Sequence, residues 1–327
     1  MRMNPIGKTT IQVSEYGLGT WAMGGGIYGM ADDAESIRTI HRAGELGVNF
    51  LDTAPMYGIG DLADGRAERV VGEAVAGQRE RWVIATKYGR HLNGNAEWWN
   101  MREDYSGAQA IRSVEESLQR MRTDYIDMLF VHSPPSALFN AEDAFAAMTQ
   151  LKQQGKIRAV GFSFWENVAD TLPQVEQFLR SGVIDAVQAK VSLLVHEALS
   201  TLFPVVRESG TAVVARESLA QGFLTDSFGP DGPFVEQDFK ASMPREEVAR
   251  RLDRANQFRF LARQLPAINS LPEAALHWAL SHPEVTSVIP GAKSVQELEQ
   301  CLAAQSSDHF PDEIMQRARG MQLAWPD

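Results

Sequence analysis

Four polar residues of this 327-residue chain lie at or just after the ends of short apolar runs, and their types suit acid–base chemistry. Asp52, Lys87 and His132 each end such a run, and Tyr57 lies five residues after the aspartate. If the runs are buried strands, the lysine and the aspartate need each other, because an unpaired charge in a protein interior is very costly. Each residue alone also has an ordinary explanation, as a cap, a solvent-reaching lysine, a partly hydrated tyrosine or a loop histidine. Their occurrence together at successive strand ends favours a catalytic site.

The runs that carry these residues belong to a series of eight apolar segments of strand length. Most are rich in Val, Ile or Phe and do not alternate cleanly with polar residues, which is typical of buried parallel strands. The segments are 16–21, 48–53, 82–87, 126–132, 158–163, 186–192, 212–217 and 286–292.

Segments with helical periodicity separate the apolar runs. Residues 270–273 and 294–297 also have the form of capping boxes, which begin helices. Strands that alternate with helices predict an α/β fold, and eight of them predict a (β/α)8 TIM barrel, with an open doubly wound sheet as the alternative. The segment before residue 14 predicts an N-terminal β-hairpin. In a barrel the active site lies at the C-terminal strand ends, where the four polar residues are found.

Composition and charge narrow the class of protein. With 44% hydrophobic and 22% charged residues and no linker-like stretch, the chain is predicted to form a single domain over residues 1–327. A net charge of −11 disfavours nucleic acid or an anionic membrane as a partner. The lone Cys301 excludes an internal disulfide, and no apolar run resembles a signal peptide or a membrane span. We therefore predict a cytoplasmic protein without a membrane partner, and its oligomeric state stays open.

The stretch 17–22 matches the dinucleotide fingerprint G-x-G-x-x-A. That fingerprint works only where a helix begins, so that the helix N-terminus meets the pyrophosphate. The glycine run 24–26 follows at once and would destabilise such a helix. The Rossmann interpretation is therefore disfavoured.

A set of short motifs resembles the aldo-keto reductase superfamily. The motifs are GLGTW from Gly17, DTAPMYG from Asp52, TK at 86–87, VHSPP from Val131 and VIPGAK from Val288. The similarity runs from about residue 6 to about residue 304, and it implies an NADPH-dependent oxidoreductase that interconverts a carbonyl (an aldehyde, ketone or sugar) and its alcohol.

The resemblance also implies roles for the four polar residues. Tyr57 would be the general acid that protonates the carbonyl oxygen, and Lys87 would lower the phenol pKa from its usual value of about 10. Asp52 would keep Lys87 charged and oriented. His132 would hydrogen-bond the substrate oxygen. No metal ligands are predicted.

Cofactor contacts follow from the same resemblance. The residues implied are Gly19, Thr20, Trp21, Asp52, Ser163, Gln188, Arg216, Ser218, Leu219, Gly222, Gly291, Lys293, Ser294 and Glu297. The sequence departs from the family pattern at Phe164, where an asparagine is usual, and at residues 191–192, where a tyrosine–asparagine pair is usual. Arg216 stands where a tyrosine often stacks on nicotinamide, and a guanidinium can also stack, although not identically.

The C-terminal segment bears on the choice between NADPH and NADH. Lys293 and Ser294 precede a predicted helix, so a cation, a hydroxyl and a helix N-terminus converge on a site suited to the adenosine 2′-phosphate. Glu297 stands where similar sequences carry Gln or Arg, and Cys301 where they carry an asparagine that contacts adenine. We predict NADPH, with NADH as a possible cofactor, and a weaker preference than in relatives with Arg at position 297.

Aromatic residues are predicted to wall the substrate pocket. Trp21, Tyr57, Trp98, Trp99 and His132 would contact substrate, with Phe223 beside them. A Trp-Trp pair in a polar loop favours a functional role. The segment 225–244, rich in Gly and Pro and carrying three phenylalanines, is predicted to be an irregular lid over the bound cofactor.

Two other functions compete with this interpretation. One is a non-catalytic NADPH-binding partner protein with the same fold. The other is a lyase in which Lys87 forms a Schiff base. The lyase needs a lysine with a lowered pKa, whereas a neighbouring Asp52 would raise it.

Overall fold

A barrel of parallel strands forms the centre of the molecule. The computed structural model describes residues 1–26, 29–94, 100–165, 167–225, 227–229, 231–232, 234, 238–303 and 308–324. Within these residues, one sheet of eight parallel strands contains β3 (Leu18–Gly19), β4 (Phe50–Asp52), β5 (Val83–Tyr88), β8 (Ile126–His132), β9 (Ile157–Ser163), β10 (Ala186–Lys190), β11 (Ala212–Arg216) and β12 (Val285–Val288).

The two edges of this sheet meet, so that the barrel is closed. The amide of Gly17 donates to the carbonyl of Val288 at 2.8 Å, and that of Gly19 donates to Pro290 at 2.9 Å. Parallel bridges also join Tyr16 to Val288 and Gly19 to Gly291. The predicted barrel is thereby confirmed, and the open-sheet alternative is wrong. The first strand is shorter than predicted because its flanking residues pair only through these isolated bonds.

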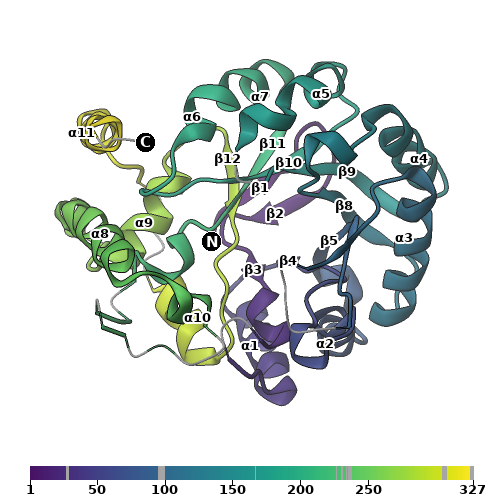
Figure 1. Cartoon of the computed structure of the whole chain (residues 1–327), viewed down its shortest axis with the longest axis horizontal. Coiled ribbons are helices and arrows are strands. Elements are labelled where there is room, and N and C mark those ends of the chain that lie inside the picture. Colours follow the sequence, from purple (N-terminus) through teal and green to yellow (C-terminus); the bar gives the residue numbers. More distant parts are fainter. Residues whose placement is uncertain are drawn as a thin grey trace.

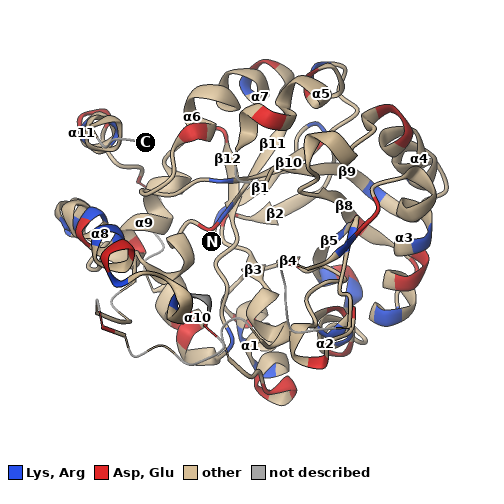
Figure 2. Cartoon of the chain, viewed as in Figure 1, with Lys and Arg blue, Asp and Glu red and all other residues tan. Residues whose placement is uncertain are grey.

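Helices surround the strands in a ring (Figure 1). They are α1 (Asp33–Glu45), α2 (Arg66–Ala74), α3 (Gly107–Met121), α4 (Ala141–Gln153), α5 (Val168–Arg180), α6 (Glu197–Thr201), α7 (Phe203–Ser209), α8 (Arg245–Asn256), α9 (Leu271–Leu280), α10 (Val295–Leu302) and α11 (Asp312–Leu323). Charged residues are spread along the outer helices (Figure 2). None of the described helices is both long and apolar enough to cross a membrane.

Short elements connect the barrel segments. The 3-10 turns are η1 (Trp21–Gly24), η2 (Ile59–Asp61), η3 (Arg79–Arg81), η4 (Ser136–Leu138), η5 (Ala220–Gly222), η6 (Phe239–Ser242) and η7 (Gln257–Leu261). Strands β6 (Arg90–His91) and β7 (Arg102–Glu103) pair antiparallel in the segment between β5 and α3. The predicted substrate residues Trp98 and Trp99 fall between these two strands and lie outside the described residues.

The N-terminal hairpin closes the bottom of the barrel, as predicted. Its strands β1 (Met3–Pro5) and β2 (Gln12–Ser14) pair antiparallel. Ile6, Ile11 and Val13 from the hairpin join one buried cluster with interior residues of the barrel strands, including Phe50 and Phe130. Because this end is filled with apolar side chains, ligands must enter from the opposite, C-terminal end.

The segment 225–244 is less irregular than predicted. It contains η6, whose first turn is capped by the Asp238 side chain. The rings of Phe223 and Phe228 lie 5.4 Å apart, those of Phe228 and Phe234 lie 5.1 Å apart, and Lys240 lies 5.3 Å from the Phe228 ring. These contacts hold the start of the segment against η5. Residues 226, 230, 233 and 235–237 lie outside the described residues, and the lid stays a prediction.

Packing inside the barrel requires a glycine in β9. A Cβ on Gly161 would lie 2.4 Å from the ring of Phe130, which is fully buried and cannot move aside easily. We expect Gly161→Ala to destabilise the fold by about 1–3 kcal/mol through overpacking. Gly320→Ala in α11 is the matched control, because a Cβ there meets no atom within 4 Å and alanine favours a helix. Urea denaturation of both variants checks this, and equal stability would contradict it.

Candidate active site

The barrel brings the four predicted catalytic residues to its C-terminal mouth. Asp52 ends β4, Lys87 lies near the end of β5 and His132 ends β8, while Tyr57 follows β4 in the next loop. Their exposed fractions are 3%, 1%, 8% and 8% for Asp52, Lys87, His132 and Tyr57. The site is therefore largely shielded from water, and each charge in it must be compensated within the protein.

Lys87 is the centre of this arrangement. Its ammonium Nζ donates to Asp52 Oδ2 at 2.7 Å, to the Thr53 carbonyl at 2.9 Å and to the Tyr57 hydroxyl at 3.1 Å. An ammonium has three donors, and all three are used. Burial lowers the pKa of Lys87, but Asp52 and then Tyr57 raise it, and the net direction is upward. Lys87 is thus a fixed cation, which contradicts the Schiff-base alternative.

Asp52 is held from two further sides. Gln188 on β10, across the barrel, donates its amide Nε2 to Asp52 Oδ1. Thr20 donates its hydroxyl and its amide to the Asp52 carbonyl, at 3.0 and 2.9 Å. The Thr20 side chain is fully buried in these contacts and is not among the residues that line the cavity described below, so it supports Asp52, and its predicted cofactor contact stays a prediction.

Tyr57 is fixed by close backbone packing and by an aromatic neighbour. The Trp21 ring stacks on it at 5.9 Å with an interplanar angle of 18°. A Cβ on Gly24 would lie 2.5 Å from the Tyr57 carbonyl, so only glycine lets η1 pass this close. Burial raises the pKa of Tyr57, the charge of Lys87 lowers it, and the net direction is upward. The phenol is therefore protonated at neutral pH.

His132 is neutral. Burial and then the nearby cations, Lys87 first among them, hold its pKa well below the ordinary value of 6.5. Its ring meets Tyr57 edge-on at 6.0 Å. The buried Nδ1 has no hydrogen-bond partner among the described residues. Because an unpaired N–H is rarer in interiors than an unpaired acceptor, the proton belongs on Nε2, which makes this atom a donor.

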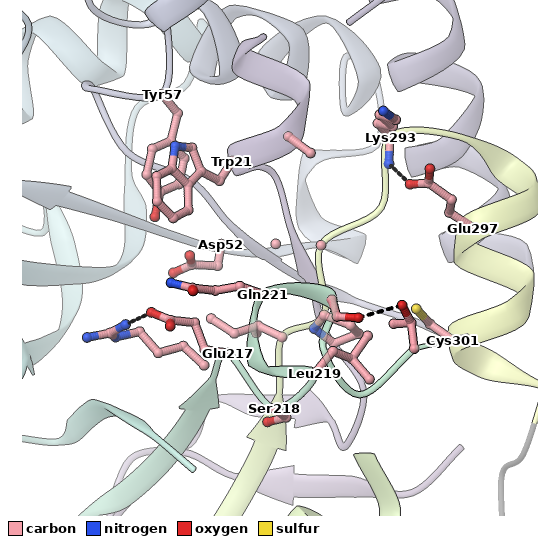
Figure 3. A pocket seen from close by; sticks show the side chains of 18 of the residues that line it. Trp21, Asp52, Tyr57, Glu217, Ser218, Leu219, Gln221, Lys293, Glu297 and Cys301 are labelled. Atoms are coloured by element: carbon pink, nitrogen blue, oxygen red, sulfur yellow. Dashed lines mark hydrogen bonds and ion pairs between the residues drawn. The ribbon is translucent and has the colours of Figure 1, made fainter. Parts of the chain in front are cut away.

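A cavity of about 870 Å³ opens over these residues at the barrel mouth. The predicted residues that line it are Gly19, Trp21, Asp52, Tyr57, Lys87, His132, Ser163, Gln188, Arg216, Ser218, Leu219, Gly222, Gly291, Lys293 and Glu297. Figure 3 shows Tyr57 and Trp21 at one end of this pocket and Lys293, Glu297 and Cys301 at the other. The cavity thus extends from the catalytic residues to α10.

Besides His132 Nδ1, two of the buried polar atoms in the cavity wall that have no partner among the described residues bear on the cofactor. They are Gln188 Oε1, beside Asp52, and the Ser218 hydroxyl in the loop after β11. A carboxamide that donates to Gln188 and a phosphate that accepts from Ser218 would satisfy both. Gly222, with φ +95°, makes the tight backbone turn beside that serine possible. The wall therefore fits a nicotinamide dinucleotide.

Ser163 and Arg216 are engaged with the protein itself. The Ser163 and Ser133 hydroxyls lie 3.0 Å apart. The Arg216 guanidinium donates to the carbonyls of Phe164 at 2.8 Å and Trp165 at 3.2 Å and pairs with Glu217. Arg216 thus fixes the loop after β9 from the wall of the cavity.

Three amides at and just before the start of α10 already have acceptors within the protein. The Ser294 hydroxyl accepts from the amide of Glu297 at 3.2 Å. The Glu297 carboxylate accepts from the amide of Lys293 at 3.0 Å, whereas in a standard capping box the donor is the amide of the N-cap residue, here Ser294. Ser294 does not line the cavity. A third acceptor, the Glu35 carboxylate of α1, takes the amide of Val295 at 3.0 Å.

Sequence reasoning missed several residues of the cavity wall. Arg90, Trp165, Met56 and Met101 lie in loops or edge strands around Tyr57 and His132. Arg90 follows Lys87 by three residues, which was the available signal. The others carry no motif.

Comparisons with known proteins agree with this geometry. The sequence model of the Aldo/keto reductase family matches residues 15–322 of this chain. The chain belongs to that family. It is 33% identical to the NADH-specific methylglyoxal reductase of Escherichia coli over 93% of each chain, and 30% identical to the aldo-keto reductase YhdN of Bacillus subtilis over 91% of this chain and 87% of YhdN.

A glycerol dehydrogenase of Gluconobacter oxydans has a similar structure, with a TM-score of 0.80, 26% identity and coverage of 99% of this chain and 97% of that one. This aldo-keto reductase is accordingly an oxidoreductase that uses a nicotinamide cofactor to interconvert a carbonyl and an alcohol.

The buried ion pair gives a stability prediction. We expect Lys87→Met to lower the free energy of unfolding by about 3–5 kcal/mol, because it leaves Asp52 buried without a counter-charge. The double variant Asp52→Asn with Lys87→Met should lose less, since it removes both charges. Urea denaturation of the single and double variants decides this, and a double variant less stable than the single one would contradict a net charge penalty.

Proposed function

We propose that this aldo-keto reductase reduces small aldehydes or ketones with Tyr57 as the proton donor. The observation that carries the proposal is the 3.1 Å contact between Lys87 Nζ and the Tyr57 hydroxyl, in a site where both groups are buried. When bound, the nicotinamide ring supplies the hydride in reduction and accepts it in oxidation. Gln188, Ser218 and Gly222 would hold it, and Tyr57 and His132 line the same cavity, so that a carbonyl oxygen bound there can meet both.

The protein's own residues then have separate tasks. His132 donates from Nε2 to the carbonyl oxygen and orients it toward Tyr57. Tyr57 gives its proton to that oxygen as negative charge develops there. Lys87, one hydrogen bond away, stabilises the phenolate that remains. Asp52 keeps Lys87 charged and in place throughout.

The raised pKa of Tyr57 sets the pH dependence. The acid form exists below that pKa and is lost as the pH rises through it, so reduction should persist through neutral pH and fall only above about pH 10, the ordinary phenol value. Oxidation needs the phenolate and should rise with pH instead. Profiles of kcat/KM in both directions check this, and a reductive rate that already falls near pH 8 would contradict it.

Removing only the proton donor tests the role directly. Tyr57→Phe should reduce kcat by roughly 10²- to 10⁴-fold while the cofactor still binds with unchanged affinity. Tyr88→Phe is the matched control, because Tyr88 is a buried tyrosine on β5 that does not line the cavity. Near-normal turnover in Tyr57→Phe would show that another group is the acid.

We further propose that NADH is the preferred cofactor, in place of the NADPH predicted from the sequence. Three amides at the start of α10 are already bonded, and two of the acceptors are carboxylates, Glu297 and Glu35. The bond from the Val295 amide, and then Arg38, lower the pKa of Glu35, which keeps it charged. A 2′-phosphate would meet these charges, whereas a ribose hydroxyl can donate to a carboxylate. The NADH-specific name of the E. coli relative agrees with this.

Removing the negative charges around the start of α10 should shift the cofactor preference from NADH toward NADPH. Glu35→Gln and Glu297→Gln keep an acceptor for the helix amides, and each should tighten binding of adenosine 2′,5′-bisphosphate by roughly tenfold while AMP binding stays unchanged. Glu299→Gln is the matched control, since Glu299 lies on the same helix and pairs with Arg42 rather than with an amide at the start of the helix. Calorimetry of the two nucleotides measures this. Tighter binding of the bisphosphate than of AMP by the unmodified enzyme would contradict the proposal.

A further inference from the structure

A second cation stands beside the catalytic residues without a catalytic task. Arg90 lies on β6, lines the cavity and has only 5% of its surface exposed. The carbon at the centre of its guanidinium lies 4.0 Å from the centroid of the Trp165 ring, and this tryptophan also lines the cavity. Such stacking fixes the plane of the guanidinium.

The contacts of Arg90 lie on one edge of that plane. Its Nε donates to the Tyr105 hydroxyl at 3.0 Å and lies 3.2 Å from Glu103 Oε1. The two outer nitrogens make no hydrogen bond with any described residue. Lys87 and Arg216 in the same wall are different, because their donors are used by carboxylates and carbonyls. Arg90 therefore presents an unused pair of parallel donors.

This pair lies close to the reaction. The Tyr105 hydroxyl that accepts from Arg90 also lies 3.4 Å from the main-chain carbonyl of His132. The charge of Arg90 acts directly on the His132 ring, as one of the cations that lower its pKa. A small molecule whose carbonyl meets His132 and Tyr57 can thus reach Arg90 with its other end.

We propose that Arg90 binds a carboxylate on the substrate, so that the enzyme acts on small carbonyl compounds that are also acids. Two parallel N–H donors match the two oxygens of a carboxylate. Glu103 offsets part of the Arg90 charge, which suits a singly charged carboxylate better than a doubly charged phosphate. This inference rests on the proposed reductase function and names the substrate class of the same site.

The test compares one aldehyde in its acid and ester forms. The substrates are 4-oxobutanoate, its methyl ester and butanal, assayed with NADH. The unmodified enzyme should prefer the acid over the ester. Arg90→Met should reduce kcat/KM for the acid by roughly 10- to 100-fold, mainly through KM, and change the values for ester and butanal by less than about threefold. The kcat/KM of Arg90→Lys for the acid should lie between those two values, because lysine keeps the positive charge but lacks the two parallel N–H donors of the guanidinium.

Controls distinguish a carboxylate-binding subsite at Arg90 from a purely structural role of this residue. Arg112→Met removes an exposed arginine that pairs with Asp104 outside the cavity, and it should leave all three substrates unaffected. If Arg90→Met lowers all three rates equally, Arg90 only braces Trp165, and the subsite is refuted. If the unmodified enzyme reduces acid and ester equally well, the subsite is refuted while the reductase function stands. If it reduces none of these aldehydes nor any other carbonyl compound, the proposed function itself fails.

Discussion

The buried pair of Lys87 and Asp52 is the constraint on which the rest of the site depends. A cation and an anion, each almost without solvent exposure, are tolerable only if their donors and acceptors are all satisfied. The closed barrel makes that possible, because β4 and β5 are neighbours and β10 reaches the aspartate from across the interior. Once Lys87 is fixed in this way, its remaining bond determines where the Tyr57 hydroxyl must lie.

The strand ends of this site could be predicted from the sequence. In a parallel barrel every strand delivers its last residue to the same mouth, so a polar residue after an apolar run is placed by topology alone. Asp52, Lys87 and His132 follow that rule. Ser163 at the end of β9 follows it too, whereas Gln188 lies in the middle of β10, and the structure finds all of them in the cavity wall.

Contacts between distant loops could not be predicted. Arg90 meets Trp165 across 75 residues, and Glu35 meets Val295 across 260, and neither spacing carries a periodic signal. The bond from Thr20 to the Asp52 carbonyl belongs to the same class, because its motif fixes a position next to the cavity while the direction of its side chain depends on Asp52. Side-chain direction in a loop is decided by tertiary partners, which a single sequence does not reveal.

The electrostatics at the N-terminus of α10 could not be predicted from the sequence for the same reason. A helix start attracts anions because its first amides lack internal acceptors, and the sequence therefore suggested a phosphate site. In the structure, however, Ser294, Glu297 and Glu35 already accept from the amides of Glu297, Lys293 and Val295. The carboxylates of Glu297 and Glu35 therefore lie at the start of α10, beside Lys293, while Arg90, only partly offset by Glu103, adds positive charge near the catalytic end. The two proposals, a preference for NADH and for an acidic substrate, both rest on this distribution of charge.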